Sequence, residues 1–136
     1  MKKTIIPILI IASLVFPASA KQISESQACI KAKQFVRSNS RLKNLSTDNV
    51  QLAYTQTTND NSNILYVFNN ADRGFVMVAG DDCVEPILGY SDTGTFDPLN
   101  IPPGLLTMMN EYTKEISHAI DNNLTPAATS TPDTRT

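Results

Sequence analysis

A run of short β-type segments between residues 64 and 97 constrains the fold of this chain more than any other feature. Residues 64–68 and 75–79 are rich in aromatic and β-branched side chains, and the polar stretch 69–74 separates them. Such runs, bounded by Asn, Asp and Gly, are typical of hairpins. Upstream, residues 50–57 alternate between apolar and polar side chains, which predicts that Val50, Leu52 and Tyr54 share one face. The sequence therefore predicts three consecutive strands joined as a meander, which needs another element to cover its apolar face.

The segment after the third strand predicts a second hairpin. Residues 87–90 are short and apolar, and Gly89 within them indicates a β-bulge or a close backbone approach. The turn-forming stretch 92–94 then leads the chain towards Thr95 and Phe96.

Helical patterns flank the strands on both sides. Residues 24–27 have the Ser-x-x-Gln spacing of a capping box, and the apolar positions after them predict a helix over about 25–38. Pro103 suits the first turn of a second helix, which ends near residues 122–123. Its apolar positions recur at steps of three and four, at Leu105, Met109, Tyr112, Ile116 and Ile120. Together these patterns predict an α+β fold, in which an N-terminal and a C-terminal helix cover a small antiparallel β-sheet made of the meander and the second hairpin.

The two ends of the chain differ from this central domain. Residues 1–20 have the layout of a secretory signal peptide, with Lys2 and Lys3, an apolar run over 5–16 and a cleavage site of the form Ala-x-Ala. We therefore expect a secreted or periplasmic protein, with no stable membrane span after the signal is cleaved. Residues 21–124 form one domain by length, and the Thr- and Pro-rich residues 125–136 predict a flexible tail.

Charge and cysteine content limit the classes of partner and of cross-link. The chain carries 11 basic and 13 acidic residues, with no basic stripe, so nucleic acid is not an expected partner. Export permits disulfides, and Cys29 and Cys83 are compatible both with a bridge and with two free thiols. We also expect the leucines at 42 and 45, in the connection after the first helix, to reach the core.

Residues that usually carry chemistry have plainer interpretations here. His118 is the only histidine of the sequence and lies late in the second helix, so neither a metal nor another cofactor is expected. Cys83 would need a base such as His118 held beside it, and nothing else of a catalytic constellation accompanies the pair. Asp81 and Asp82 are adjacent, which suits a turn better than acid–base work across a cleft. We predict no catalytic residues, and a domain that binds rather than an enzyme.

The central run resembles the prodomain of streptopain-type cysteine proteases, a module that also occurs as stand-alone inhibitors of those enzymes. The resemblance rests on Gly74-Phe-Val-Met-Val-Ala-Gly-Asp-Asp, on Ile87-Leu-Gly-Tyr-Ser-Asp-Thr-Gly-Thr-Phe-Asp and on Asn100-Ile-Pro-Pro ahead of a helix. It extends from the first helix to about residue 123. Family members usually carry a basic or polar residue in place of Cys83, and Pro-Glu in place of Glu85-Pro86. The protease half, with its Gly-Cys motif and catalytic His, is not expected in this chain.

The resemblance implies an inhibitor that blocks the active-site cleft of a streptopain-like cysteine protease. It points to an extended loop and the following helix start for protease binding, with the residues Phe96, Asn100, Ile101, Pro102 and Pro103. From the residues alone, a good start for a helix is the favoured interpretation of Asn100-Ile-Pro-Pro, and the resemblance makes the two interpretations about even. Two alternatives stay open. The chain is compatible with the prodomain of a truncated or longer streptopain-type protease acting in cis, and with a non-inhibitory surface adhesion or interaction module.

Overall fold

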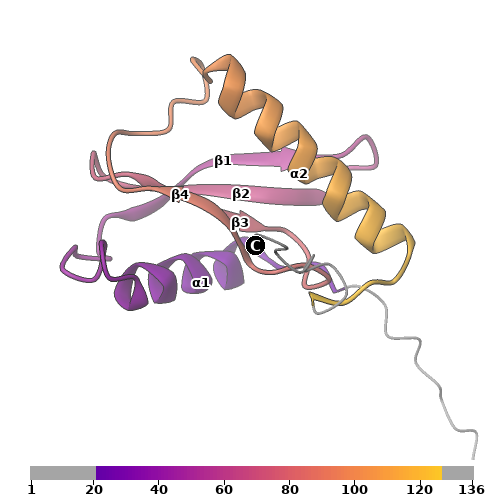
Figure 1. The fold of residues 1–136 in the computed structure, drawn as a ribbon, viewed down its shortest axis with the longest axis horizontal. Coiled ribbons are helices and arrows are strands. Elements are labelled where there is room, and N and C mark those ends of the chain that lie inside the picture. The colour runs from indigo at the N-terminus through magenta and orange to yellow at the C-terminus, as the bar shows by residue number, and fades with distance from the viewer. Residues whose placement is uncertain (1–20, 127–136) are drawn as a thin grey trace, which may run out of the picture.

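Two helices lie on opposite faces of a four-stranded antiparallel sheet in the computed structural model, which describes residues 21–126 (Figure 1). The sheet order is β1-β2-β3-β4, so neighbours in sequence are also neighbours in space. The elements are α1 (Glu25–Ser38), β1 (Val50–Thr57), β2 (Asn63–Asn70), β3 (Phe75–Ala79), β4 (Ile87–Ser91) and α2 (Pro103–Asp121). The predicted α+β fold, with an N-terminal and a C-terminal helix, is confirmed.

Helix α1 begins at the capping box that the sequence predicts. The Ser24 hydroxyl accepts a hydrogen bond from the Gln27 backbone N–H at 3.2 Å, and the Ser24 backbone N–H donates to the Gln27 side chain at 3.0 Å. The helix buries Ala28, Ala32 and Val36 against the sheet. Because these side chains are small, the helix can approach the strands closely.

The central strands β2 and β3 are buried on both faces, which gives the domain two cores. The core under α1, called the α1 cluster, contains Ile23, Ala28, Ala32, Val36, Leu42, Val50, Tyr66, Phe68, Val76 and Val78. The core under α2, called the α2 cluster, contains Ile64, Leu65, Val67, Met77, Ala79, Cys83, Val84, Phe96, Met109, Ile116 and Ala119. The two central strands therefore read as near-continuous hydrophobic runs.

One strand departs from the predicted alternation. A register shift in β1 between Leu52 and Tyr54 inserts Ala53 as an extra residue against β2. Val50 and Leu52 consequently pack with the α1 cluster, whereas Tyr54 packs with the α2 cluster. The expectation that these three side chains share one face is wrong, because a bulge reverses the side-chain alternation beyond it.

The segment predicted as a second hairpin joins the meander and does not form a hairpin of its own. Strand β4 pairs with β3, and a register shift between Met77 and Val78 confirms the irregularity expected near Gly89. A Cβ atom at Gly89 would lie 3.0 Å from the Met77 methyl carbon, so the backbone does approach closely there. Thr95 and Phe96 form no strand, and β4 is thus the fourth strand of one meander.

The two cysteines are free thiols on opposite sides of the sheet. Cys29 packs with the α1 cluster and Cys83 belongs to the α2 cluster. The sheet between them keeps the sulfur atoms apart, so of the two states compatible with the sequence the structure has the free thiols. Within residues 21–126, neither helix is long and apolar enough to cross a membrane.

The start of the described chain is tied to the end of β3. Gln22 and Asp81 form an isolated antiparallel bridge, and the Ile23 N–H donates to the Gly80 carbonyl at 2.9 Å. The buried Tyr66 hydroxyl donates to the Ile23 carbonyl at 2.7 Å. A central strand therefore holds the residues just before α1 in place. Residues 1–20, expected to be a signal peptide, and most of the expected 125–136 tail lie outside the described residues.

We predict that Tyr66→Phe destabilises the protein. The substitution keeps the ring and leaves the buried Ile23 carbonyl without its donor, which lowers the free energy of unfolding by about 1–3 kcal/mol. Chemical denaturation followed by circular dichroism measures the change. Tyr90→Phe is the matched control, since the Tyr90 side chain is exposed. Equal stability of the two variants would contradict the role of the Tyr66 hydroxyl.

Candidate functional site

The segment from Phe96 to Pro103, called here the 96–103 loop, starts from a buried anchor. The Phe96 side chain is 3% exposed. Its ring centroid lies 5.7 Å from the ring centroid of Tyr54 and 5.7 Å from that of Phe75. The Asn69 side chain donates to the Phe96 carbonyl at 2.9 Å and accepts from the Phe96 N–H at 2.8 Å. This pair of bonds fixes the beginning of the loop to β2. Phe96, one of the predicted binding residues, packs in the core.

A β-turn occupies the middle of the 96–103 loop. The Asn100 N–H donates to the Asp97 carbonyl at 3.1 Å, which closes the turn. The Asp97 carboxylate accepts from the Leu99 N–H at 2.9 Å and from the Asn100 side-chain amide at 2.8 Å. The expectation of an extended loop is therefore wrong for residues 97–100, because the Asp97 side chain and Pro98 both favour a turn.

The loop divides the predicted binding residues into two groups. Ile101 is half-buried against the α2 cluster and, like Phe96, faces inward. Asn100, Pro102 and Pro103 are exposed. Pro102 is the N-cap of α2 with φ −56°, and Pro103 is the first helical residue, where the missing N–H has no consequence. The loop thus joins the helix start through two residues with fixed φ angles.

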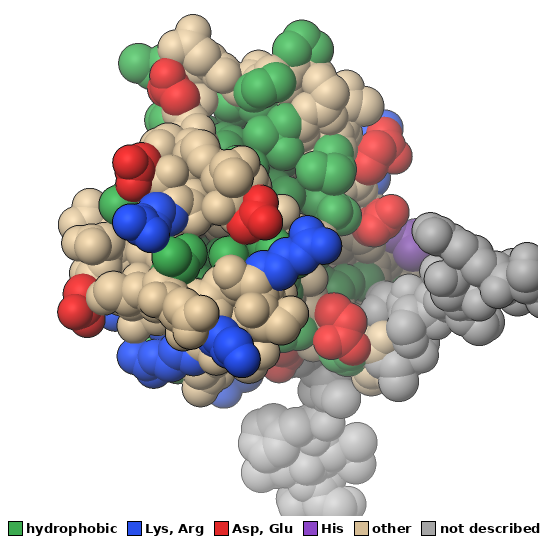
Figure 2. Space-filling model, turned by 60° about the vertical axis from the view of Figure 1, so that its left-hand side comes forward, with side chains coloured by type: hydrophobic (Ala, Val, Ile, Leu, Met, Phe, Trp, Pro, Cys, Tyr) green, Lys and Arg blue, Asp and Glu red, His purple; other side chains and the backbone are tan. Residues whose placement is uncertain are grey.

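Sequence reasoning missed the most exposed apolar side chain of the loop. Leu99 is 89% exposed, at the turn that Asp97 closes. Leu106 and Met108, in the first turns of α2, are 43% and 40% exposed. Figure 2 shows hydrophobic side chains gathered over the upper part of the molecule, where Figure 1 places this loop and the start of α2. The dipeptide Asp97-Pro98 is a turn signal that could have pointed to Leu99 as the residue presented at its tip.

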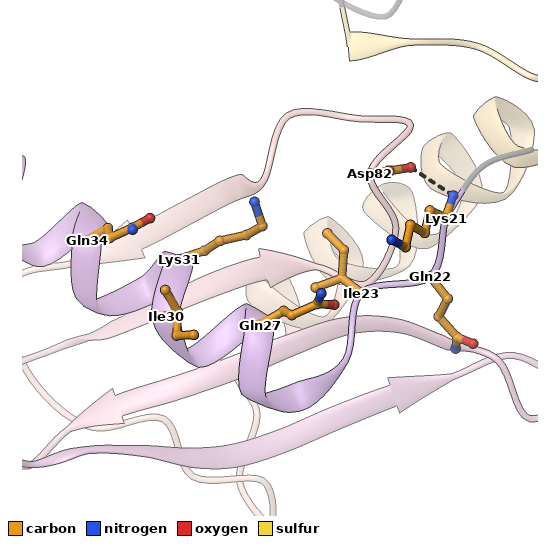
Figure 3. A pocket seen from close by; sticks show the side chains of 8 residues that line it. All are labelled: Lys21, Gln22, Ile23, Gln27, Ile30, Lys31, Gln34 and Asp82. Atoms are coloured by element: carbon orange, nitrogen blue, oxygen red, sulfur yellow. Dashed lines mark hydrogen bonds between the residues drawn. The ribbon is translucent and has the colours of Figure 1, made fainter. Parts of the chain in front are cut away.

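Apart from the 96–103 loop, the surface has a hollow beside α1. Figure 3 shows side chains of α1 and of the N-terminal segment around it, and the Lys21 backbone N–H donates to Asp82 at 2.8 Å. The hollow measures about 400 Å³ and is lined by Lys21, Gln22, Ile23, Gln27, Ile30, Lys31, Gln34 and Asp82. The lysines, amides and one carboxylate of this lining suit hydrogen bonding with solvent.

The buried thiol is unsuited to nucleophilic work. Burial, with a hydrogen bond to Asp81 as the next cause, raises the pKa of Cys83 to about 12. The thiol therefore stays protonated at neutral pH, whereas the thiolate is the nucleophilic form. A nucleophilic Cys83 would need His118 as its base. His118 is exposed on α2, and its ring nitrogen Nδ1 lies 3.2 Å from the side-chain amide nitrogen of Asn122. Among residues 21–126, no cluster of three or more His, Cys, Asp or Glu could hold a metal ion.

We predict that Asn69→Ala releases the start of the 96–103 loop. Both hydrogen bonds to the Phe96 backbone are lost, so the Phe96 amide should exchange with solvent about 10-fold faster or more. Hydrogen exchange followed by NMR measures this rate. The Tyr66 amide, in the middle of the same strand, is the internal control. A similar acceleration at both amides would indicate general destabilisation of β2 and not a local clamp.

The Asp97 turn should depend on pH. Hydrogen bonds from the Asn100 side chain and then from the Leu99 backbone lower the pKa of Asp97 below its usual 3.8. A carboxylate whose pKa is depressed by folding stabilises the turn above pH 3.8, and that contribution is lost as the pH falls through the lowered pKa. The Leu99 and Asn100 amide signals should therefore stay constant near neutral pH and shift only in acid. In Asp97→Asn the same acid titration should be absent.

Comparisons with known proteins relate the chain to two proteases and to one family. The chain is 27% identical over 109 residues to the thiol protease/hemagglutinin PrtT of Porphyromonas gingivalis, covering 79% of this chain and 13% of that protein. It is 40% identical over 52 residues to streptopain of Streptococcus pyogenes, covering 38% of this chain and 13% of that protein. The chain thus spans about an eighth of the length of these relatives, and no solved structure matches it. Residues 20–116 match the Spi protease inhibitor family, and the chain belongs to that family.

Proposed function

We propose that this protein is an exported inhibitor of a streptopain-like cysteine protease. The observation that carries the proposal is the family match over residues 20–116, which includes the whole sheet, the 96–103 loop and most of α2. Similarity to segments of streptopain and of PrtT supports a cysteine protease as the partner. Membership of an inhibitor family points to a protein that is not itself an enzyme.

The proposed contact is the 96–103 loop with the start of α2, inserted into the active-site cleft of the protease. Asn69 fixes one end of the loop, the helix fixes the other end, and Asp97 closes the turn between them. A loop that is ordered before binding loses little conformational entropy on binding. Asn100, Pro102 and Pro103 supply exposed surface, while Phe96 and Ile101 support the loop from below.

The size of the domain suits such a contact. A standard protease–inhibitor interface buries roughly 1,600 Å² in total, about half of it on each partner. The accessible surface of the chain is 9781 Å². The loop and the adjoining face of α2 would therefore have to bury only a small fraction of that surface. The proposed site therefore needs no large rearrangement of the sheet.

Export is supported by the sequence at the amino end and by the family. Residues 1–20 combine lysines, an apolar run and a small-residue cleavage site. A protease inhibitor of this family would meet its target outside the cytoplasm only if it is itself exported. N-terminal sequencing of the protein recovered from the producing cells should begin near Lys21.

A prodomain acting in cis is the second candidate function. Both relatives are longer proteases, and the chain matches only 13% of each of them. The same fold and the same loop would then act on a protease joined to it. Inhibition by the separate chain, added in trans, favours the first candidate, and sequencing the gene beyond residue 136 tests the second.

The central test is an inhibition assay with the purified exported protein. Added to a streptopain-type protease, the protein should abolish cleavage of a small peptide substrate at micromolar concentration or below, with papain as the comparison enzyme. Asn100→Ala should weaken inhibition by roughly 10-fold, because it removes both the exposed amide and its bond to Asp97. Asn59→Ala, in the exposed turn between β1 and β2, should inhibit like the unmodified protein.

Two results would count against this proposal. Absence of binding at micromolar concentration would exclude the inhibitor and favour a surface module. Equal inhibition by Asn100→Ala and Asn59→Ala would exclude Asn100 from the contact.

A further inference from the structure

We infer that Leu99 is the apolar anchor of the inhibitor, which enters a hydrophobic pocket in the protease's cleft. This inference rests on the proposed function and names the chemistry of the partner at that site. Leu99 is 89% exposed, well above the next large apolar side chain, Ile30 at 56%. Exposed leucines are common on protein surfaces, so exposure alone does not identify a contact. The argument depends on what holds Leu99 in place.

The turn around Leu99 is built from side chain and backbone together. The ring of Pro98 fixes its own φ angle directly before Leu99. Asp97 accepts hydrogen bonds with both carboxylate oxygens, one from the Leu99 N–H and one from the Asn100 side-chain amide. The Leu99 side chain is held in solvent by a backbone that is already ordered.

Both ends of the turn are attached to the rigid part of the molecule. On one side, Asn69 holds the Phe96 backbone and the Phe96 ring packs in the α2 cluster. On the other side, Ile101 packs against the same cluster, and the Leu106 N–H donates to the Pro102 carbonyl at 2.9 Å in the first helical turn. Leu99 therefore projects from a fixed base, as a preorganised binding residue must.

The surroundings of Leu99 specify an apolar pocket and not a charged one. The residues that follow Leu99 along the chain also expose apolar side chains, at Pro102, Pro103, Leu106 and Met108. The carboxylate of Asp97 is already bound within the turn. The fitting partner is a concave, aliphatic pocket large enough for one leucine, rimmed by surface that accepts the start of α2. A second copy of this chain is the competing occupant.

The test compares three substitutions at Leu99 with one control. Leu99→Ala should raise the inhibition constant about 10- to 100-fold, which is the loss expected when a buried leucine side chain is removed from an interface. Leu99→Lys should raise it further, because an ammonium group would be left in an apolar pocket. Leu99→Met, of similar volume, should stay within about 5-fold of the unmodified protein. Ile30→Ala, on α1, is the control and should not change inhibition.

The outcomes separate this inference from the proposed function. If the unmodified protein inhibits and Leu99→Ala and Leu99→Lys inhibit equally well, the Leu99 inference is overturned and the inhibitor proposal stands. If the unmodified protein does not inhibit the protease, the proposed function is wrong, and the Leu99 inference that rests on it is wrong as well. Gel filtration of the free protein tests the competing occupant: a dimer that Leu99→Lys converts to a monomer, with inhibition unchanged, overturns the inference. Thermal unfolding should be the same for all four variants, because both side chains are exposed.

Discussion

Burial of β2 and β3 on both faces is the constraint from which the rest of this structure follows. A sheet with apolar side chains on both sides needs a cover on each side, and the chain supplies α1 before the sheet and α2 after it. The connection from β4 to α2 must therefore cross from the sheet to the face opposite α1. The 96–103 loop makes that crossing, so its position is a consequence of how the two cores are divided.

The same constraint explains why the 96–103 loop can be rigid in so small a domain. Its anchors belong to the core: Phe96 and Ile101 lie with the α2 cluster, and Asn69 belongs to a central strand. Only the residues between these anchors face solvent. Substitution at these few positions leaves both cores intact, while the supporting residues serve stability and geometry together.

Local chemistry made much of this fold predictable. The Ser24 and Gln27 pair marks the start of α1, and Pro103 with the apolar stripe marks α2, because these signals act within one or two helical turns. The bulge at Ala53 was not predictable, since it depends on the register with β2 and no glycine marks it. The burial of Phe96 depends on Asn69, 27 residues away, and a single apolar residue in a polar stretch does not reveal which way it points. For Leu99 a local signal existed in Asp97-Pro98, but it specifies the turn and not its exposure.

The Asn69 clamp also bears on whether such an inhibitor survives contact with a protease. Proteolysis generally proceeds through segments that open, at least transiently, before they are cut. Opening residues 96–100 would require breaking both amide bonds to Phe96, withdrawing its ring from the core and undoing the Asp97 turn. The first two of these steps disturb structure outside the loop. The peptide bonds around the tip are thus held in a conformation that resists the opening on which cleavage depends, so this loop would be a poor substrate for a protease.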